Sequence, residues 1–118
     1  MNQNAARSLL QKNAQTGKTL TYREFAAALR LTEPPIIRAT AKILEELMCQ
    51  DHMANRPLLA ALVIQQGRNK IPRLGFYQIL SELKLYNGEA EGSAAIQWHQ
   101  TEITKLKEYY PSSNPNDT

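Results

Sequence analysis

Apolar residues first recur at helical spacing in the stretch NAARSLLQKNAQTG. These apolar residues are Ala5, Ala6, Leu9 and Leu10, so the second pair follows the first at a distance of three to four positions. This period matches one face of an α-helix, and a glycine such as Gly17 commonly ends one. The pattern predicts a first helix that stops before Gly17.

A second helix start is marked by LTYREFAAALRL. Thr21 and Glu24 have the spacing of a capping box, in which each side chain binds the backbone amide of the other residue. Leu20 and Phe25 are placed for a hydrophobic staple across the same helix start. Two independent signals therefore predict a helix that begins just after Thr21, with Phe25 facing inward.

A longer helix is predicted from about Pro35 to about His52. The double proline in LTEPPIIRAT suits a first turn, because proline lacks an amide hydrogen that would have no partner there. One face of the helix is apolar and the other is charged. The inward residues are expected to be Ile36, Thr40, Ile43, Leu44, Leu47 and Met48, and the outward ones Arg38, Lys42, Glu45 and Glu46.

The next apolar segment, RPLLAALVIQQ, reads as a strand. It is short, continuous and rich in Leu, Val and Ile, which favours a buried strand over another helix. The basic turn QGRNK follows. Pro72, in KIPRLG, limits any return strand to a short edge piece. We therefore expect only a small β-ribbon here.

Two further helices are predicted towards the C-terminus. One follows Gly75, and NGEAEGS separates it from a last helix that Ser93 can cap. The inward side of the last helix is expected to hold Ile96, His99, Ile103, Leu106 and Tyr110. The predicted fold class is mainly α with some α+β character: a single domain over residues 1–110, and a disordered polar tail over residues 111–118.

The order of these elements is that of a winged helix-turn-helix domain with additional C-terminal helices. A helix, a short capped helix, a turn, a longer helix, a strand, a basic turn and a closing helix follow one another. RLTEPP would be the turn that sets the second and third helices at a steep angle.

Several segments also resemble the DNA-binding part of the DNA alkyltransferases and alkyltransferase-like proteins. TYREFAAALRL is similar to their T/S-Y-G-E-L-A segment, and PPIIRAT to their P-x-A-A-R-A-V recognition-helix start. NRPLLAALVI, GRNKIP and GFYQILSELKLYNG follow in the order of that family's active-site segment, wing and next helix. The resemblance implies that Tyr22 helps to rotate a nucleotide, that Arg38 fills the vacated stack, and that wing cations contact DNA.

The same comparison argues against alkyl transfer. Those enzymes carry a Pro-Cys-His-Arg motif ahead of the wing, whereas RPLLAALVI has no cysteine, histidine or arginine after Pro57. Arg23 also replaces the glycine of the Y-G-E motif, which argues against a close backbone approach to a phosphate at that point. The resemblance therefore implies DNA binding without the family's chemistry.

Composition sets broad limits on function. Of 118 residues, 42% are apolar and 21% charged, as in an ordinary globular protein. The net charge of +3 favours polyanions weakly. The first twenty residues contain no apolar signal-peptide core, so a cytoplasmic location is expected. The longest apolar run, PLLAALVI, is too short to cross a membrane, so no membrane partner is expected.

The candidate nucleic-acid-binding residues are Tyr22, Arg23, Arg38, Lys42, Arg68, Lys70 and Arg73. Arg38 lies near the start of its helix, where helix-turn-helix proteins contact bases and where the helix dipole disfavours a cation. Lys42 has Glu45 and Glu46 at three- and four-residue spacing, so solvated charge pairs are an alternative to a phosphate contact. The wing cations could bind phosphate or serve solubility alone. Duplex DNA is the expected partner.

A protein-interaction or dimerisation module is the alternative. Its interface would be formed by the last helix, through Trp98, Tyr109 and Tyr110. An enzyme is not expected, because no catalytic constellation is present. Cys49 and His52 have the spacing of a nucleophile with its base, or of two metal ligands, but a zinc site needs more ligands and His99 is the only other histidine. We therefore expect an inert thiol at Cys49, and neither a metal nor a cofactor.

Overall fold

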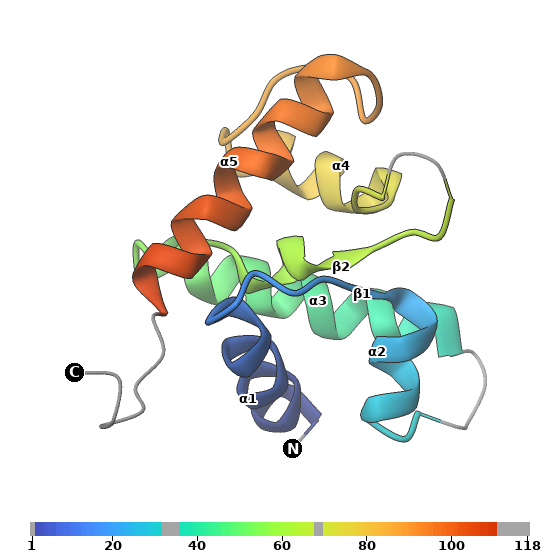
Figure 1. Cartoon of the computed structure of the whole chain (residues 1–118). Helices are drawn as coiled ribbons and strands as arrows, with labels where there is room; N and C mark the ends of the chain where they lie inside the picture. The colour runs from blue at the N-terminus through green and yellow to red at the C-terminus, as the bar shows by residue number, and fades with distance from the viewer. Residues whose placement is uncertain (1, 32–35, 68–69, 111–118) are drawn as a thin grey trace.

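The computed structural model describes residues 2–31, 36–67 and 70–110. Its elements are α1 (Asn2–Ala14), β1 (Leu20–Thr21), α2 (Tyr22–Ala28), α3 (Ile36–Met53), the 3-10 helix η1 (Leu59–Leu62), β2 (Val63–Ile64), α4 (Leu74–Glu82) and α5 (Ser93–Tyr109) (Figure 1). The prediction of a mainly α fold is confirmed. The helix expected from Pro35 begins at Ile36 among the described residues, while the linker at 32–35 and the predicted tail at 111–118 lie outside them.

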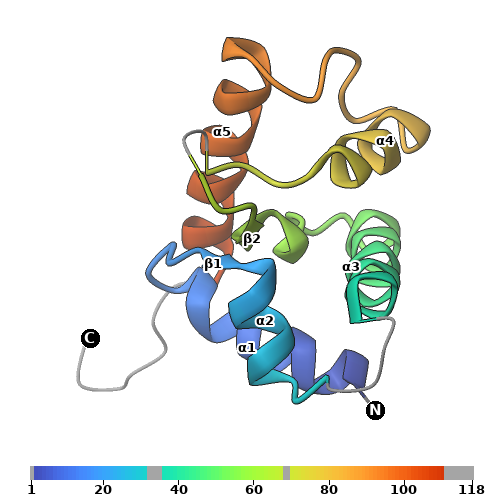
Figure 2. The same cartoon turned by 90° about the vertical axis from the view of Figure 1, so that its right-hand side faces the viewer.

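The 3-10 helix η1 lies at the centre of the core. It packs against α1, α3 and α5, and none of its four side chains is more than 1% exposed. Figures 1 and 2 show that α4 and the first half of α5 extend to one side of β2, away from α1 and α2. The core therefore joins helices that come from both halves of the chain.

The predicted start of α2 is confirmed. Thr21 Oγ1 accepts the Glu24 N–H at 3.1 Å, and Glu24 Oε1 accepts the Thr21 N–H at 2.8 Å, which completes the capping box. Leu20 and Phe25 are both buried, as a hydrophobic staple requires. The helix ends before Arg30, whose φ of 57° cannot continue an α-helix.

The sheet differs from the predicted ribbon. β1 pairs in parallel with β2, with Leu20 opposite Val63, while the first part of the expected strand is the helical turn η1. In the segment after β2, the Gln65 N–H donates a backbone hydrogen bond to the Ile71 carbonyl at 2.9 Å, which brings the two ends of the loop together. The prediction of a strand across the whole apolar run was therefore wrong.

Two buried carboxylates explain the helical turn. Glu102 Oε2, from α5, accepts the Leu58 N–H at 2.7 Å, and Asp51 Oδ2, from α3, accepts the Leu59 N–H at 3.1 Å. The amides at the start of a helix have no partner within it, so acceptors supplied from outside stabilise this end.

The inward face of α5 is also rotated from the prediction. Ala95, His99, Glu102 and Leu106 are buried, at a spacing of four, three and four residues. The other residues expected on this face, Ile96, Ile103 and Tyr110, are only half-buried. In addition, Ser93 is the first helical residue rather than the cap, because Gly92 occupies the cap position.

His99 is a buried histidine that should make stability depend on pH. Its Nε2 lies 2.7 Å from the Ala61 carbonyl oxygen, so the neutral ring donates Nε2–H. Burial lowers the pKa of His99 below its ordinary 6.5, against a smaller opposing effect of this bond. The folded protein therefore favours the neutral ring. The contribution of the neutral His99 ring to the free energy of unfolding is present above pH 6.5. It is lost as the pH falls through the pKa of His99 in the folded protein.

We expect the free energy of unfolding to fall as the pH drops below about 6.5. Much of this slope should be missing in His99→Gln, which keeps an N–H donor but does not titrate. His52→Gln, at the half-buried second histidine, is the matched control. Urea unfolding across this pH range measures the slopes. Equal slopes in the wild type and in His99→Gln would contradict this account of His99.

Candidate nucleic-acid interface

Tyr22, the first residue of α2, is tied to the start of α4. Its hydroxyl accepts the backbone N–H of Arg73 at 2.9 Å, and the Arg73 guanidinium carbon lies 4.2 Å from the ring centroid. A cation at this distance is attracted by the aromatic face. Burial raises the pKa of Tyr22, although Arg73 opposes the shift, so the phenol stays protonated at neutral pH.

A groove of about 280 Å³ lies beside this pair, among α2, α3 and α4. Tyr22 and Arg73 line it together with Glu45 of α3 and Gln78 of α4, and Met48 and other apolar residues complete the wall. The family resemblance makes Arg38 the partner of Tyr22, whereas the cation over the ring in the structure is Arg73. One face of the Tyr22 ring is therefore covered by Arg73.

The charge on the exposed face of α3 changes from positive to negative along the helix. Arg38 and Lys42 are exposed and one turn apart, while Glu45 is exposed one turn later and Glu46 is half-buried. No ion pair joins Lys42 to either glutamate among the described residues. Only the first two turns of α3 are therefore basic, which limits how much of this helix could approach a phosphate backbone.

Further cations come from neighbouring segments. Arg23 in α2, Lys70 after β2 and Arg73 before α4 are all exposed. Figure 2 faces the end of the molecule where α2, the start of α3 and the loop after β2 are seen together. Arg68, also predicted to bind nucleic acid, lies outside the described residues.

The described cations at this end make no ion pairs. Across residues 2–31, 36–67 and 70–110, the ion pairs join Arg7 and Arg56 to Asp51, at 2.7 and 3.2 Å. Arg7 is therefore the counterion of a buried carboxylate and not part of a basic surface. By contrast, the charges of Arg23, Arg38, Lys42, Lys70 and Arg73 are not neutralised by a described carboxylate.

The three aromatic residues of the alternative interface are not equivalent. Trp98 is half-buried and packs edge-on against Phe76, with ring centroids 5.8 Å apart. Tyr109 is 50% exposed. The hydroxyl of Tyr110 is buried without a hydrogen-bond partner in the described part of the chain, and burial raises its pKa. Of the three, Tyr109 offers the largest free surface.

The cysteine and the histidines do not form a metal site. Cys49 is half-buried on α3, and His99 is committed to the carbonyl of Ala61. No group of three or more histidine, cysteine, aspartate or glutamate residues that could hold a metal ion occurs within the described ranges.

The sequence patterns missed Asp51 and Glu102, the two carboxylates that cap η1. Both are buried, at 0% and 6% exposure. The sequence does contain a sign that Glu102 is buried. Together with Ala95, His99 and Leu106 it has the three- and four-residue spacing of one helix face. Charged residues are rarely fully buried, which is why the pattern was assigned to the wrong face.

Comparison of the chain with protein-family models, with curated proteins and with solved structures found no match. In addition, none of the described helices is both long and apolar enough to span a membrane.

Proposed function

We propose that this chain is a non-catalytic winged-helix protein that binds duplex DNA through the start of α3 and the segment after β2. The observation that carries the proposal is a set of exposed cations without ion-pair partners from α2, α3 and the segment between β2 and α4: Arg23, Arg38, Lys42, Lys70 and Arg73. Such cations bind phosphates by releasing counterions.

The order of elements supports the winged-helix part of the proposal. α1, β1, α2, α3, β2, the basic loop and α4 follow one another as in that fold. The bond between Gln65 and Ile71 closes the loop at its base. The parallel pairing of β1 with β2 is a departure from that fold. The resemblance of about residues 19–88 to alkyltransferase-like proteins also favours the proposal, although no family model matches the chain.

The contacts divide by position on the fold. Arg38 is near the N-terminus of α3, where a recognition helix meets base edges and where the dipole also favours a phosphate. Glu45, one turn beyond Lys42, would repel the backbone and so restricts insertion to the first two turns. Lys70 and Arg73 would contact phosphates, and Tyr22 holds the backbone of Arg73 in place.

The proposal is tested by titrating a fluorescent duplex DNA with Arg38→Gln combined with Lys42→Gln. Counterion release predicts a loss of about tenfold in affinity for each phosphate contact removed, at about 0.1 M salt. Lys84→Gln combined with Lys107→Gln is the control, because both lysines are exposed and the net charge changes equally. Equal losses in the two double variants would show that net charge alone matters, and would overturn the interface.

A further inference from the structure

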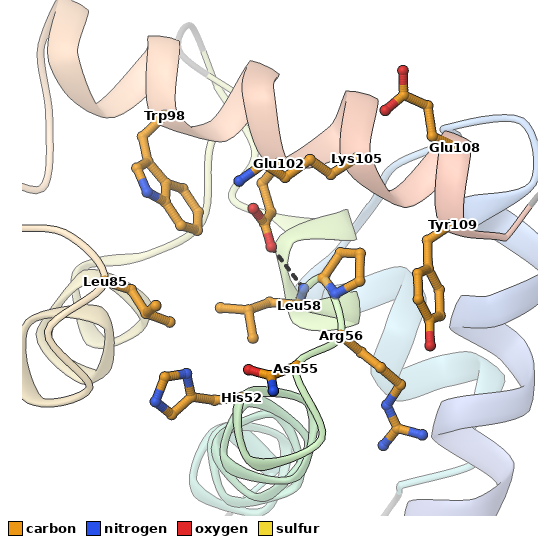
Figure 3. A pocket seen from close by; sticks show the side chains of 11 residues that line it. His52, Asn55, Arg56, Leu58, Leu85, Trp98, Glu102, Lys105, Glu108 and Tyr109 are labelled. Atoms are coloured by element: carbon orange, nitrogen blue, oxygen red, sulfur yellow. Dashed lines mark hydrogen bonds between the residues drawn. The ribbon is translucent and has the colours of Figure 1, made fainter.

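A second groove, of about 540 Å³, lies between the end of α3 and α5 (Figure 3). This volume falls within the range of about 300–1,000 Å³ that ligand pockets occupy. His52 and Asn55 line one side, Trp98 and Glu102 the other, and Leu85 closes one end. The residues proposed to bind DNA do not line it.

Glu102 gives this groove an unusual chemical feature. Glu102 is only 6% exposed, and its Oε2 accepts the Leu58 N–H. The other carboxylate oxygen makes no hydrogen bond to a described residue, yet it is not sealed from solvent. It points into the groove on the side of Trp98 (Figure 3). A nearly buried carboxylate with one free oxygen is a strong site for a hydrogen-bond donor that carries positive charge.

Neither of the two described cations that line the groove, Lys105 and Arg56, forms an ion pair with Glu102. Lys105, one turn later on α5, lowers the pKa of Glu102, although burial raises it by more. Lys105 is exposed and forms no ion pair with Glu102 in the part of the chain described. Arg56 also lines the groove, but it is paired with Asp51. Lys105 is therefore a loose, exchangeable counterion.

The rim of the groove is apolar and exposed. Leu85 is 37% exposed and Tyr109 is 50% exposed, and both line the groove. They are two of the four large hydrophobic side chains found exposed among the described residues. Exposed apolar side chains beside a groove are typical of surfaces that contact another polypeptide, and a small amine could not cover both of them.

From these features we infer that the groove binds an arginine side chain of a partner polypeptide, with its guanidinium on the free oxygen of Glu102. A guanidinium fits better than an ammonium, because it is planar, weakly hydrated and stacks on aromatic rings such as that of Trp98. Apolar residues beside this arginine would contact Leu85 and Tyr109. The partner displaces Lys105 from the neighbourhood of Glu102.

The test uses NMR titration of the full chain with acetyl-Leu-Arg-Leu amide, and with the same peptide carrying citrulline, which keeps the shape of arginine but has no charge. The arginine peptide should shift the signals of Trp98, Leu85 and Tyr109, and citrulline should weaken binding at least about tenfold. Equal binding of both peptides, or shifts confined to other surfaces, would overturn the proposal.

Two variants change the affinity in opposite directions. Glu102→Gln keeps an acceptor for the Leu58 N–H and should also weaken the arginine peptide about tenfold. Lys105→Gln removes the competing cation and should tighten it severalfold, which a purely structural role of Glu102 would not predict. Because Lys105 is exposed, this variant keeps the test decisive even if Glu102→Gln does not fold. Unchanged or weaker binding by Lys105→Gln would contradict the inference, as would methylguanidinium binding as tightly as the peptide.

Discussion

Replacing Asp51 by alanine is expected to lower the free energy of unfolding by about 3 kcal/mol. Asp51 is fully buried, where it pairs with Arg7 and Arg56 and accepts the Leu59 N–H. Its loss leaves two arginines without a counterion and one buried amide without an acceptor. The side chains of Arg7 and Arg56 keep 17% and 30% exposure, so they can regain some water, which places the effect at the low end for a broken buried ion pair.

Urea unfolding at a fixed neutral pH measures this effect. Asp51→Asn keeps the size of the side chain and an acceptor for the Leu59 N–H, so this variant should lose less of the free energy of unfolding than Asp51→Ala. Glu108→Ala removes an exposed carboxylate from α5 and should change stability by less than about 0.5 kcal/mol. If Asp51→Ala were as stable as Glu108→Ala, Asp51 would not organise α1, α3 and η1 in the way described.

The largest expected effect on binding comes from removing four cations of the proposed interface together. The variant carries Arg23→Gln, Arg38→Gln, Lys42→Gln and Arg73→Gln. Its affinity for duplex DNA should fall about a thousandfold or more at about 0.1 M salt, if each cation contacts one phosphate. Arg73→Gln leaves the backbone bond to Tyr22 intact, so the fold should be kept.

A charge-matched variant separates this effect from net charge. Lys12→Gln, Lys18→Gln, Lys84→Gln and Lys107→Gln also remove four exposed cations, all outside the proposed interface. This control should lose much less affinity in the same fluorescence titration. A loss equal to that of the interface variant would mean that DNA is attracted by overall charge and not by this end of the molecule.

Features set by near neighbours in the sequence were predictable. The capping box needs only Thr21 and Glu24, three residues apart, and the structure confirms it. The long helix α3 follows from the spacing of residues such as Leu44, Leu47 and Met48, which are all buried. In each case the interaction that decides the structure lies within one or two helical turns.

Features set by distant residues were not predictable. The apolar run after Pro57 begins as a 3-10 helix because Glu102, 44 residues from Leu58, accepts an amide at its start. The cation over Tyr22 is Arg73, 51 residues away. The sequence identified both Tyr22 and Arg73 as candidate site residues, but no local pattern pairs them. Tertiary contacts of this kind override local preference.

The most direct test of the proposed function is the salt dependence of wild-type binding to duplex DNA. Five exposed cations, if each neutralises one phosphate, predict that the logarithm of the association constant falls against the logarithm of salt concentration with a slope of about −4.5. The interface variant without four of these cations should show a slope close to −1. A wild-type slope near zero, or no binding at low salt, would contradict the proposal.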